Sequence, residues 1–135
     1  MLESLKLGLY QTFILDDNYQ YFIKGLGTTL TVTIFALVLG VILGVIVAVI
    51  RSAYDQQPEK KKGLPLKILN GICKVYLTVI RGTPMMVQAA VIYYGIAQLW
   101  HLNLNRTVAA LVIVSINTGA YLAEVIRGGI NATPK

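Results

Sequence analysis

Charged residues are scarce in this chain. They make up 13% of its 135 residues, whereas 56% are hydrophobic, and soluble domains usually hold about 25% charged residues. Charges are absent from three intervals, which run from Lys24 to Arg51, from Arg81 to Arg106 and from Arg106 to Glu124. Each interval approaches or exceeds the roughly 17–25 residues that cross a bilayer as a helix. This scarcity argues against a soluble globular domain and predicts an integral membrane protein.

Residue types that commonly carry catalysis or bind metals are also few. The chain has one cysteine, Cys73, and one histidine, His101, so an internal disulfide is excluded. The sequence contains no Cys/His/carboxylate cluster spaced for a metal. The stretch "GTPMMVQ" lacks the lysine and hydroxyl pair of a nucleotide-binding loop. We therefore expect no catalytic residue, metal or cofactor here, and we expect any ATP hydrolysis to occur on another chain.

The first apolar segment, residues 25–50, is long enough to span a bilayer. Its β-branched residues are also typical of strands, but a helix satisfies its own backbone hydrogen bonds in lipid and a lone strand does not. Small residues recur at every fourth position and so share one face of the helix, at Ala36, Gly40, Gly44 and Ala48. We predict that another helix packs closely against this face.

A basic segment follows the first span. Arg51 and the lysines at 60, 61, 62 and 67 are opposed only by Asp55 and Glu59. The positive-inside rule places the loop 51–65 in the cytoplasm and the N-terminal arm 1–24 outside. The lysines also suit anionic lipid, although a topology signal is the simpler interpretation.

The remaining segments predict an all-α membrane helix bundle. Residues 66–82 have the 3.6-residue period of an amphipathic helix. This helix either lies in the interface or forms the cytoplasmic part of a longer second span. Thr83-Pro84 disfavours helical geometry at Thr83, so the second span is predicted at 84–100. The third span, at 107–127, returns to the cytoplasm, which gives three transmembrane helices and one amphipathic helix.

Polar residues within the predicted spans are the best candidates for function, because they are costly in lipid and usually face a partner or a pathway. Gln88 lies in the second span, and Asn117, Thr118 and Tyr121 lie in the third. Asn117 and Tyr121 share a face, since they are one helical turn apart. For Asn117 and Thr118 two interpretations remain open: they line a passage for a polar solute, or they hydrogen-bond between helices.

The end of the third span combines charged residues with glycine. Glu124 and Arg127 are spaced to form an i,i+3 ion pair at the cytoplasmic boundary. Gly128 and Gly129 are expected to turn the chain sharply, since glycine reaches backbone angles that other residues avoid. Gly-Gly is also an ordinary helix stop. Pro134 is suited to open a following helix.

Two stretches carry a family resemblance. "RGTPMMVQ" (81–88) and "NTGAYLAEVIRGGI" (117–130) resemble hallmark sequences of bacterial polar amino-acid ABC transporter permeases of the histidine/glutamine type. The opening of the first span, "GLGTTLTVT", is similar in placement, so the resemblance covers about 22–135. It marks a family motif at Arg81, Gly82, Thr83 and Pro84.

The resemblance implies a subunit that provides the translocation pathway of an ATP-driven amino-acid importer in the bacterial cell membrane. It would dimerise with itself or with a close relative, couple to cytoplasmic ATP-binding subunits, and receive solute from an extracytoplasmic amino-acid-binding protein. Nucleic acid is not expected as a partner.

Family members usually have about five spans and carry a Glu-Ala-Ala coupling motif after the stretch that matches "VIRGGINATPK". Residues 128–135 would then begin the coupling segment, with Glu124, Arg127, Gly128, Gly129 and Pro134 as the approach to the ATPase. We therefore expect a fragment or a truncated product. The alternative is a small channel-like or accessory membrane protein that is complete at three spans.

Overall fold

The computed structural model describes residues 1–134, and within this range the regular elements are helices. The chain divides into two compact units, Met1–Val32 and the part from Thr33 onward. In the first unit, α1 (Leu2–Phe13) and a short 3-10 turn, η1 (Leu15–Asp17), lead to α2 (Tyr19–Gln56). Asp16 and Asp17 have positive φ angles of 58° and 54°. The rings of Phe13 and Phe22 lie 4.6 Å apart across this turn.

Helix α2 extends beyond the predicted first span at both ends. It begins at Tyr19 and ends at Gln56, whereas the apolar segment covers 25–50. Helical hydrogen bonds therefore continue past the point where hydropathy falls, because no proline interrupts them before Pro58. The predicted arm 1–24 accordingly consists of α1, η1 and the start of α2.

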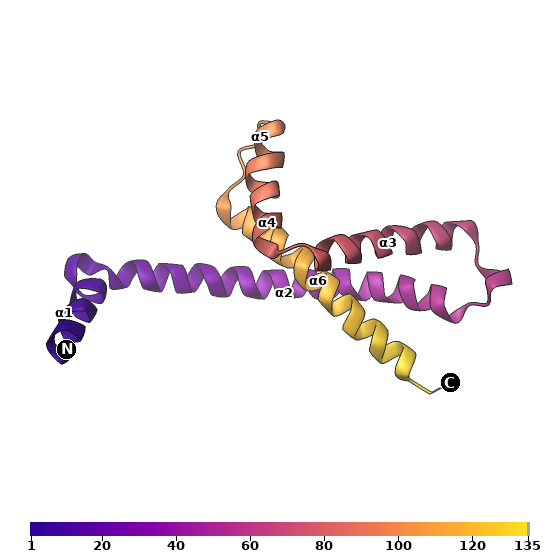
Figure 1. The fold of residues 1–135 in the computed structure, drawn as a ribbon, viewed down its shortest axis with the longest axis horizontal. Helices are drawn as coiled ribbons and strands as arrows, with labels where there is room; N and C mark the ends of the chain where they lie inside the picture. The colour runs from indigo at the N-terminus through magenta and orange to yellow at the C-terminus, as the bar shows by residue number, and fades with distance from the viewer. Residues whose placement is uncertain (135) are drawn as a thin grey trace. The chain divides into compact units, whose positions relative to one another are not determined.

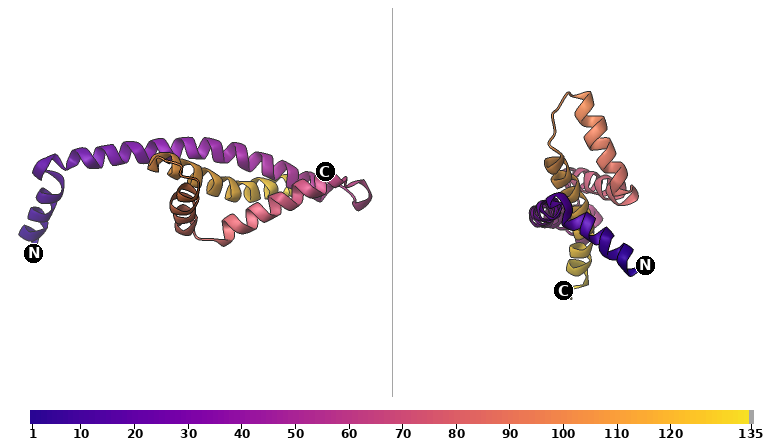
Figure 2. Two further views of the ribbon diagram at one scale, coloured as in Figure 1. Left: turned by 90° about the horizontal axis from the view of Figure 1, so that it is seen from above. Right: turned by 90° about the vertical axis from the view of Figure 1, so that its left-hand side faces the viewer.

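The second unit continues through a loop with the 3-10 turn η2 (Glu59–Lys61) into α3 (Leu64–Gly82). Next come α4 (Met85–Ala90), the π-helix η3 (Val91–Ile96) and the short α5 (Ala97–Leu99). Helix α6 (Arg106–Ala132) completes the order. Figures 1 and 2 show α3 turning back along the second half of α2, and Figure 1 shows α6 crossing α2 and passing the C-terminal end of α3.

A bend of 106° separates α3 from the helical segment that begins at Met85 (Figure 1). Thr83 is extended, with φ −112° and ψ 140°, as expected for a residue before proline. Pro84 is also extended, with ψ 138°. The sequence thus locates this break correctly, and the helical segments from Met85 to Leu99 follow it where the second span is predicted.

Helix α6 does not turn at its two glycines, so that prediction is wrong. Gly128 and Gly129 both lie inside the helix, and neither has a positive φ. Glycine costs only about 1 kcal/mol relative to alanine in a helix, which the flanking helical hydrogen bonds outweigh. The helix ends instead at Thr133, which is extended, with ψ 128°, because it precedes Pro134. The predicted segment 128–135 thus begins as helix, and Lys135 lies outside the described residues.

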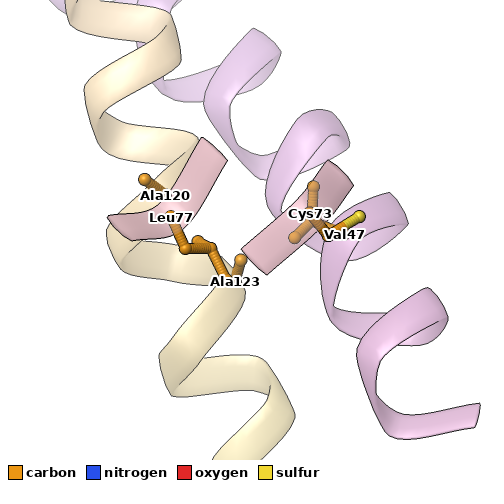
Figure 3. Packing of buried hydrophobic residues seen from close by; sticks show 5 residues of the cluster. All are labelled: Val47, Cys73, Leu77, Ala120 and Ala123. Atoms are coloured by element: carbon orange, nitrogen blue, oxygen red, sulfur yellow. The ribbon is translucent and has the colours of Figure 1, made fainter. Parts of the chain in front are cut away.

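Small side chains allow α2, α3 and α6 to pack closely. Figure 3 shows the buried cluster, which consists of Val47, Cys73, Leu77, Ala120 and Ala123. Ala36 and Ala48 are fully buried on α2, and Gly40 and Gly44 are buried between them. A Cβ atom at Gly40 would lie 2.8 Å from Thr118 Cβ, and one at Gly44 would lie 3.1 Å from the Gly119 carbonyl oxygen. The stripe on α2 therefore lies directly against α6.

We predict that Gly40→Ala destabilises the chain relative to Gly71→Ala by about 1–3 kcal/mol. The Cβ at Gly40 would overlap Thr118, whereas Gly71 has no neighbouring atom within 4 Å of an added Cβ. Both variants gain the same helix propensity, so their difference isolates the packing cost. Thermal unfolding in detergent micelles measures it. Equal midpoints for the two variants would show that the α2–α6 contact is loose.

Candidate functional site

Gln88 replaces the donor that Pro84 removes at the bend. In a continuous helix the N–H of residue 84 would bond to the carbonyl of Ile80, but proline has no N–H. The Gln88 amide nitrogen donates to that carbonyl oxygen at 2.8 Å, and it also lies 3.0 Å from the Thr83 carbonyl oxygen and 2.9 Å from Thr83 Oγ1. Gln88 is buried, with 9% of its surface exposed. Its side chain therefore satisfies the backbone at the break.

The other half of the Gln88 amide joins the bend to α6. Its Oε1 atom accepts a hydrogen bond from Asn117 Nδ2 at 3.3 Å. Asn117 is half-buried, and within the described part of the chain its Oδ1 atom has no recorded partner. Nearby, the Tyr76 hydroxyl donates to the carbonyl of Ile116 and so ties α3 to α6. The structure thus brings together two of the predicted site residues, Gln88 and Asn117.

The other two pathway candidates lie in different surroundings. Thr118 is half-buried, and its Cβ and Cγ2 atoms face the backbone of α2 at Gly40, which favours the helix-packing interpretation for this residue. Tyr121 is 50% exposed, and the Arg81 guanidinium lies 5.6 Å from the centre of its ring. Arg81 and Tyr121 therefore form a polar edge one helical turn beyond Asn117.

A small cavity lies beside Gln88. It has a volume of about 260 Å³ and is lined mainly by aliphatic side chains of α3, α4, η3 and α6, with Thr83 and Gln88 as its polar members. The side-chain polar groups of these two residues are already engaged at the bend. Among the described residues, this cavity therefore offers no unengaged side-chain polar group to a polar solute.

An ionic cluster joins the ends of α2, α3 and α6. Arg127 donates from Nε and from Nη2 to Asp55 Oδ2, each at 2.7 Å, and its Nη1 lies 3.4 Å from Glu124 Oε2. Arg81 Nη1 lies 4.0 Å from the same Glu124 oxygen. The spacing of Glu124 and Arg127 predicts their pair correctly. Asp55, which is 72 residues from Arg127 in the chain, was not predicted as a partner.

The cluster is only partly open to solvent. The exposed fractions of the Arg127, Glu124 and Asp55 side chains are 25%, 27% and 31%. Asp55 lies beyond the apolar segment that ends at residue 50, and hydrogen bonding from Arg127 holds the pKa of its carboxyl below the usual value. Asn131 adds a further hydrogen bond to Asp55 at 3.4 Å. These contacts fix the last turns of α6 against the end of α2.

Comparison with known proteins identifies the relatives of this chain. The arginine ABC transporter permease protein ArtM of Escherichia coli K12 is 38% identical over 122 residues, which cover 84% of this chain and 50% of ArtM. The arginine transport system permease protein ArtQ of Bacillus subtilis is 38% identical over 85 residues, which cover 54% of this chain and 39% of ArtQ. Its relatives are amino-acid ABC transporter permeases.

A solved structure agrees with these permease relatives. It is a crystal structure of an amino acid ABC transporter with histidines, which is 35% identical to this chain and has a TM-score of 0.67. The match covers 84% of this chain and 47% of the solved one. The putative glutamine transport permease GlnP of Rickettsia prowazekii is 35% identical over 85 residues, 54% of this chain and 39% of GlnP. No protein-family model matches the chain.

This chain spans half or less of the length of the permeases that it matches. It is an integral membrane protein, and the regular elements of its described residues are helices. Among the described residues, the helical stretch Leu15–Gln56 and helix α6 are each long and apolar enough to cross a membrane. The bent pair of α3 and the segment Met85–Leu99 gives a third candidate if it is taken as one span.

The structure also shows how the sequence motif 81–84 is used. Arg81 contacts Glu124 and Tyr121, Gly82 ends α3, and Thr83 with Pro84 makes the bend. Asp55 and Tyr76 have contacts that sequence reasoning missed. For Asp55 the available signal was an acidic residue in a mainly basic segment, and for Tyr76 it was a hydroxyl on the apolar face of an amphipathic helix.

We predict that Gln88→Leu destabilises the chain by about 2–4 kcal/mol. The substitution leaves the carbonyls of Ile80 and Thr83 without this donor, and a buried unsatisfied polar group costs about 1–3 kcal/mol. Gln98→Leu is the matched control because Gln98 is exposed. Chemical unfolding in micelles compares the two variants. A similar loss for both would contradict the role given to Gln88.

We predict a coupling free energy of about 1–2 kcal/mol between Asp55 and Arg127, since the pair combines charge with two short hydrogen bonds. A double-mutant cycle with Asp55→Ala and Arg127→Ala measures it. The control pair is Lys62 and Glu59, whose carboxylate is 83% exposed and whose coupling should stay below about 1 kcal/mol.

The same coupling should depend on pH. Because the folded-state pKa of Asp55 is lowered, its stabilising contribution is complete above the unfolded pKa of about 3.9 and is lost as the pH falls through the lower folded value. Repeating the cycle at acidic pH measures this loss. A coupling that stayed constant down to pH 2 would contradict an ionised pair.

Proposed function

We propose that this chain forms part of the permease subunit of an ATP-driven amino-acid importer. The observation that carries the proposal is the match to ArtM, which covers 84% of the chain at 38% identity. The agreement in fold with a solved amino acid ABC transporter supports it independently. The substrate class is amino acids, because the named relatives include arginine and putative glutamine permeases.

Within this proposal, Asn117 and Tyr121 face the translocation pathway. Asn117 Oδ1 is an acceptor with no recorded partner in the described chain, and Tyr121 is exposed one turn away. Gln88 contributes by holding Asn117 through its Oε1 atom. Thr118, which was also a pathway candidate, instead packs against Gly40 of α2 and so helps to hold α6 in place.

The coupling approach to the ATPase is assigned to the end of α6. Glu124 and Arg127 connect this helix to Arg81 of α3 and Asp55 of α2. Gly128 and Gly129 continue the helix as far as Ala132, just before Pro134. A movement applied to this end would therefore reach all three helices through the ionic cluster, which is what a coupling element requires.

The proposed partners follow from the transporter class. They are cytoplasmic ATP-binding subunits, an extracytoplasmic amino-acid-binding protein and a second permease subunit. ATP hydrolysis would take place on the ATP-binding subunits. The proposed location is the bacterial cell membrane with the N-terminus outside, because the basic segment 51–65 favours the cytoplasmic side.

Uptake measurements test the proposal. We expect that deleting the coding gene in its host lowers the uptake of radiolabelled arginine, glutamine or histidine. We also expect that the wild-type gene restores it. Unchanged uptake of all three, and of the other amino acids in a competition panel, would contradict an amino-acid importer.

Complementation with variants tests the pathway assignment. We predict that Asn117→Leu lowers uptake by a factor of roughly ten, the worth of one hydrogen bond, when it is expressed at the wild-type level in the membrane. Leu111→Ala, on the same helix, is the control and should have a smaller effect. Equal effects would assign Asn117 to packing rather than to solute contact.

A further inference from the structure

The charged side chains between Arg51 and Lys74 are unevenly paired. The two acidic side chains between Arg51 and Lys74 are both paired within the chain: Asp55 binds Arg127, and Glu59 binds Lys62 at 3.1 Å. Lys62 also lies 4.1 Å from the centre of the Tyr54 ring. Both carboxylates are thus neutralised by Arg127 and Lys62, and neither is available to the other lysines of this segment.

Four lysines in this region remain without a negative partner. Lys60, Lys61, Lys67 and Lys74 are exposed, and in the described chain their ammonium groups have no recorded ion pair or hydrogen bond. We call these four residues the basic patch. Lys67 and Lys74 are two turns apart on α3, so they lie on the same side of that helix.

The basic patch has a further positive charge behind it. Arg51 of α2 donates to Asn70 Oδ1 at 3.4 Å, and Asn70 lies between Lys67 and Lys74 on α3. The Arg51 Nε atom is buried and has no partner among the described residues. The side chains around Asn70 therefore combine one incompletely satisfied guanidinium with two free ammonium groups.

An apolar row runs along another side of the same helix. Leu64, Ile68, Ile72 and Val75 are between 55% and 71% exposed, and their spacing of three and four residues aligns them on one face of α3. Because α3 runs back along the second half of α2 (Figure 1), this exposed row contacts acyl chains while the long lysine side chains extend toward the headgroups.

We propose that the basic patch binds the headgroups of anionic phospholipids at the cytoplasmic surface of the membrane. Arg51, the first residue after the apolar segment 25–50, donates to Asn70 between Lys67 and Lys74, so these lysines lie near the end of that segment, where it reaches a bilayer surface. Its four uncompensated charges complement phosphate, and clusters of this kind beside a transmembrane helix attract anionic lipid. The apolar row fixes α3 at the depth where the lysines meet the headgroups.

A lipid-competition experiment on the full chain tests this proposal. The purified chain is incubated in detergent with equal amounts of phosphatidylglycerol and phosphatidylcholine that have identical acyl chains. Native mass spectrometry then gives the ratio of the two bound lipids. We expect replacement of all four lysines by glutamine to lower this ratio tenfold or more, since each lysine near an anionic surface strengthens binding roughly fivefold.

Two matched variants accompany it. Replacement of the same four lysines by arginine keeps the charge and should keep the wild-type ratio. Lys6→Gln with Lys24→Gln removes positive charges from the first unit and should also leave the ratio unchanged. Far-UV circular dichroism verifies that each variant retains its helices, and the arginine variant keeps the test decisive if the glutamine variant loses them.

Three results would overturn the proposal. One is a lipid ratio that does not follow the charge of the patch. The glutamine variant would then keep the wild-type ratio, or the arginine variant would lose the preference for phosphatidylglycerol. Another is a glutamine variant whose lipid ratio is unchanged but which inserts into vesicles in both orientations, as measured by protease accessibility. That result would make the lysines a topology signal alone. The third is a glutamine variant whose lipid ratio is unchanged but which no longer binds a co-purifying ATP-binding subunit. That result would assign the patch to a protein partner.

Discussion

Pro84 removes one backbone donor, and the amide of Gln88 replaces it. A carbonyl without a donor costs several kcal/mol in lipid, so a sharp bend within a membrane protein requires a substitute of this kind. Gln88 serves the carbonyls of Ile80 and Thr83 on one side and Asn117 on the other. This side chain therefore links the end of α3 and the bend to Asn117 of α6.

The packing of α2, α3 and α6 supports the same arrangement by a different means. Hydrophobic burial gives little specificity between helices in lipid, so close approach and polar contacts must decide how they associate. Gly40 and Gly44 allow the close approach, because without side chains they let α6 come into van der Waals contact with α2. The polar contacts are made near the helix ends by Arg127, which forms ion pairs with both Asp55 and Glu124. Both contacts hold α6, the helix that carries Asn117, against α2.

Local features of this fold were predictable from the sequence. The break at Thr83-Pro84, the small-residue stripe on α2 and the Glu124–Arg127 spacing each follow from neighbouring residues. The Arg127–Asp55 ion pair was not predictable from the sequence, because it depends on how two helices that are far apart in the chain pack together. The continuation of α6 through Gly128 and Gly129 was misjudged, since glycine permits a turn without requiring one. Gln88 was identified as a polar residue within a span, but its role at the bend depends on an angle that the sequence does not specify.

The central claim is that Gln88 fixes the angle between α3 and the segment after Pro84. The most direct measurement is the distance between spin labels at Val75 and Leu99, both exposed, in a Cys73→Ala background reconstituted in lipid. Double electron–electron resonance should give one narrow distance distribution with Gln88 and a broad one with Gln88→Leu. The account would be contradicted by an equally narrow distribution at the same distance in both proteins.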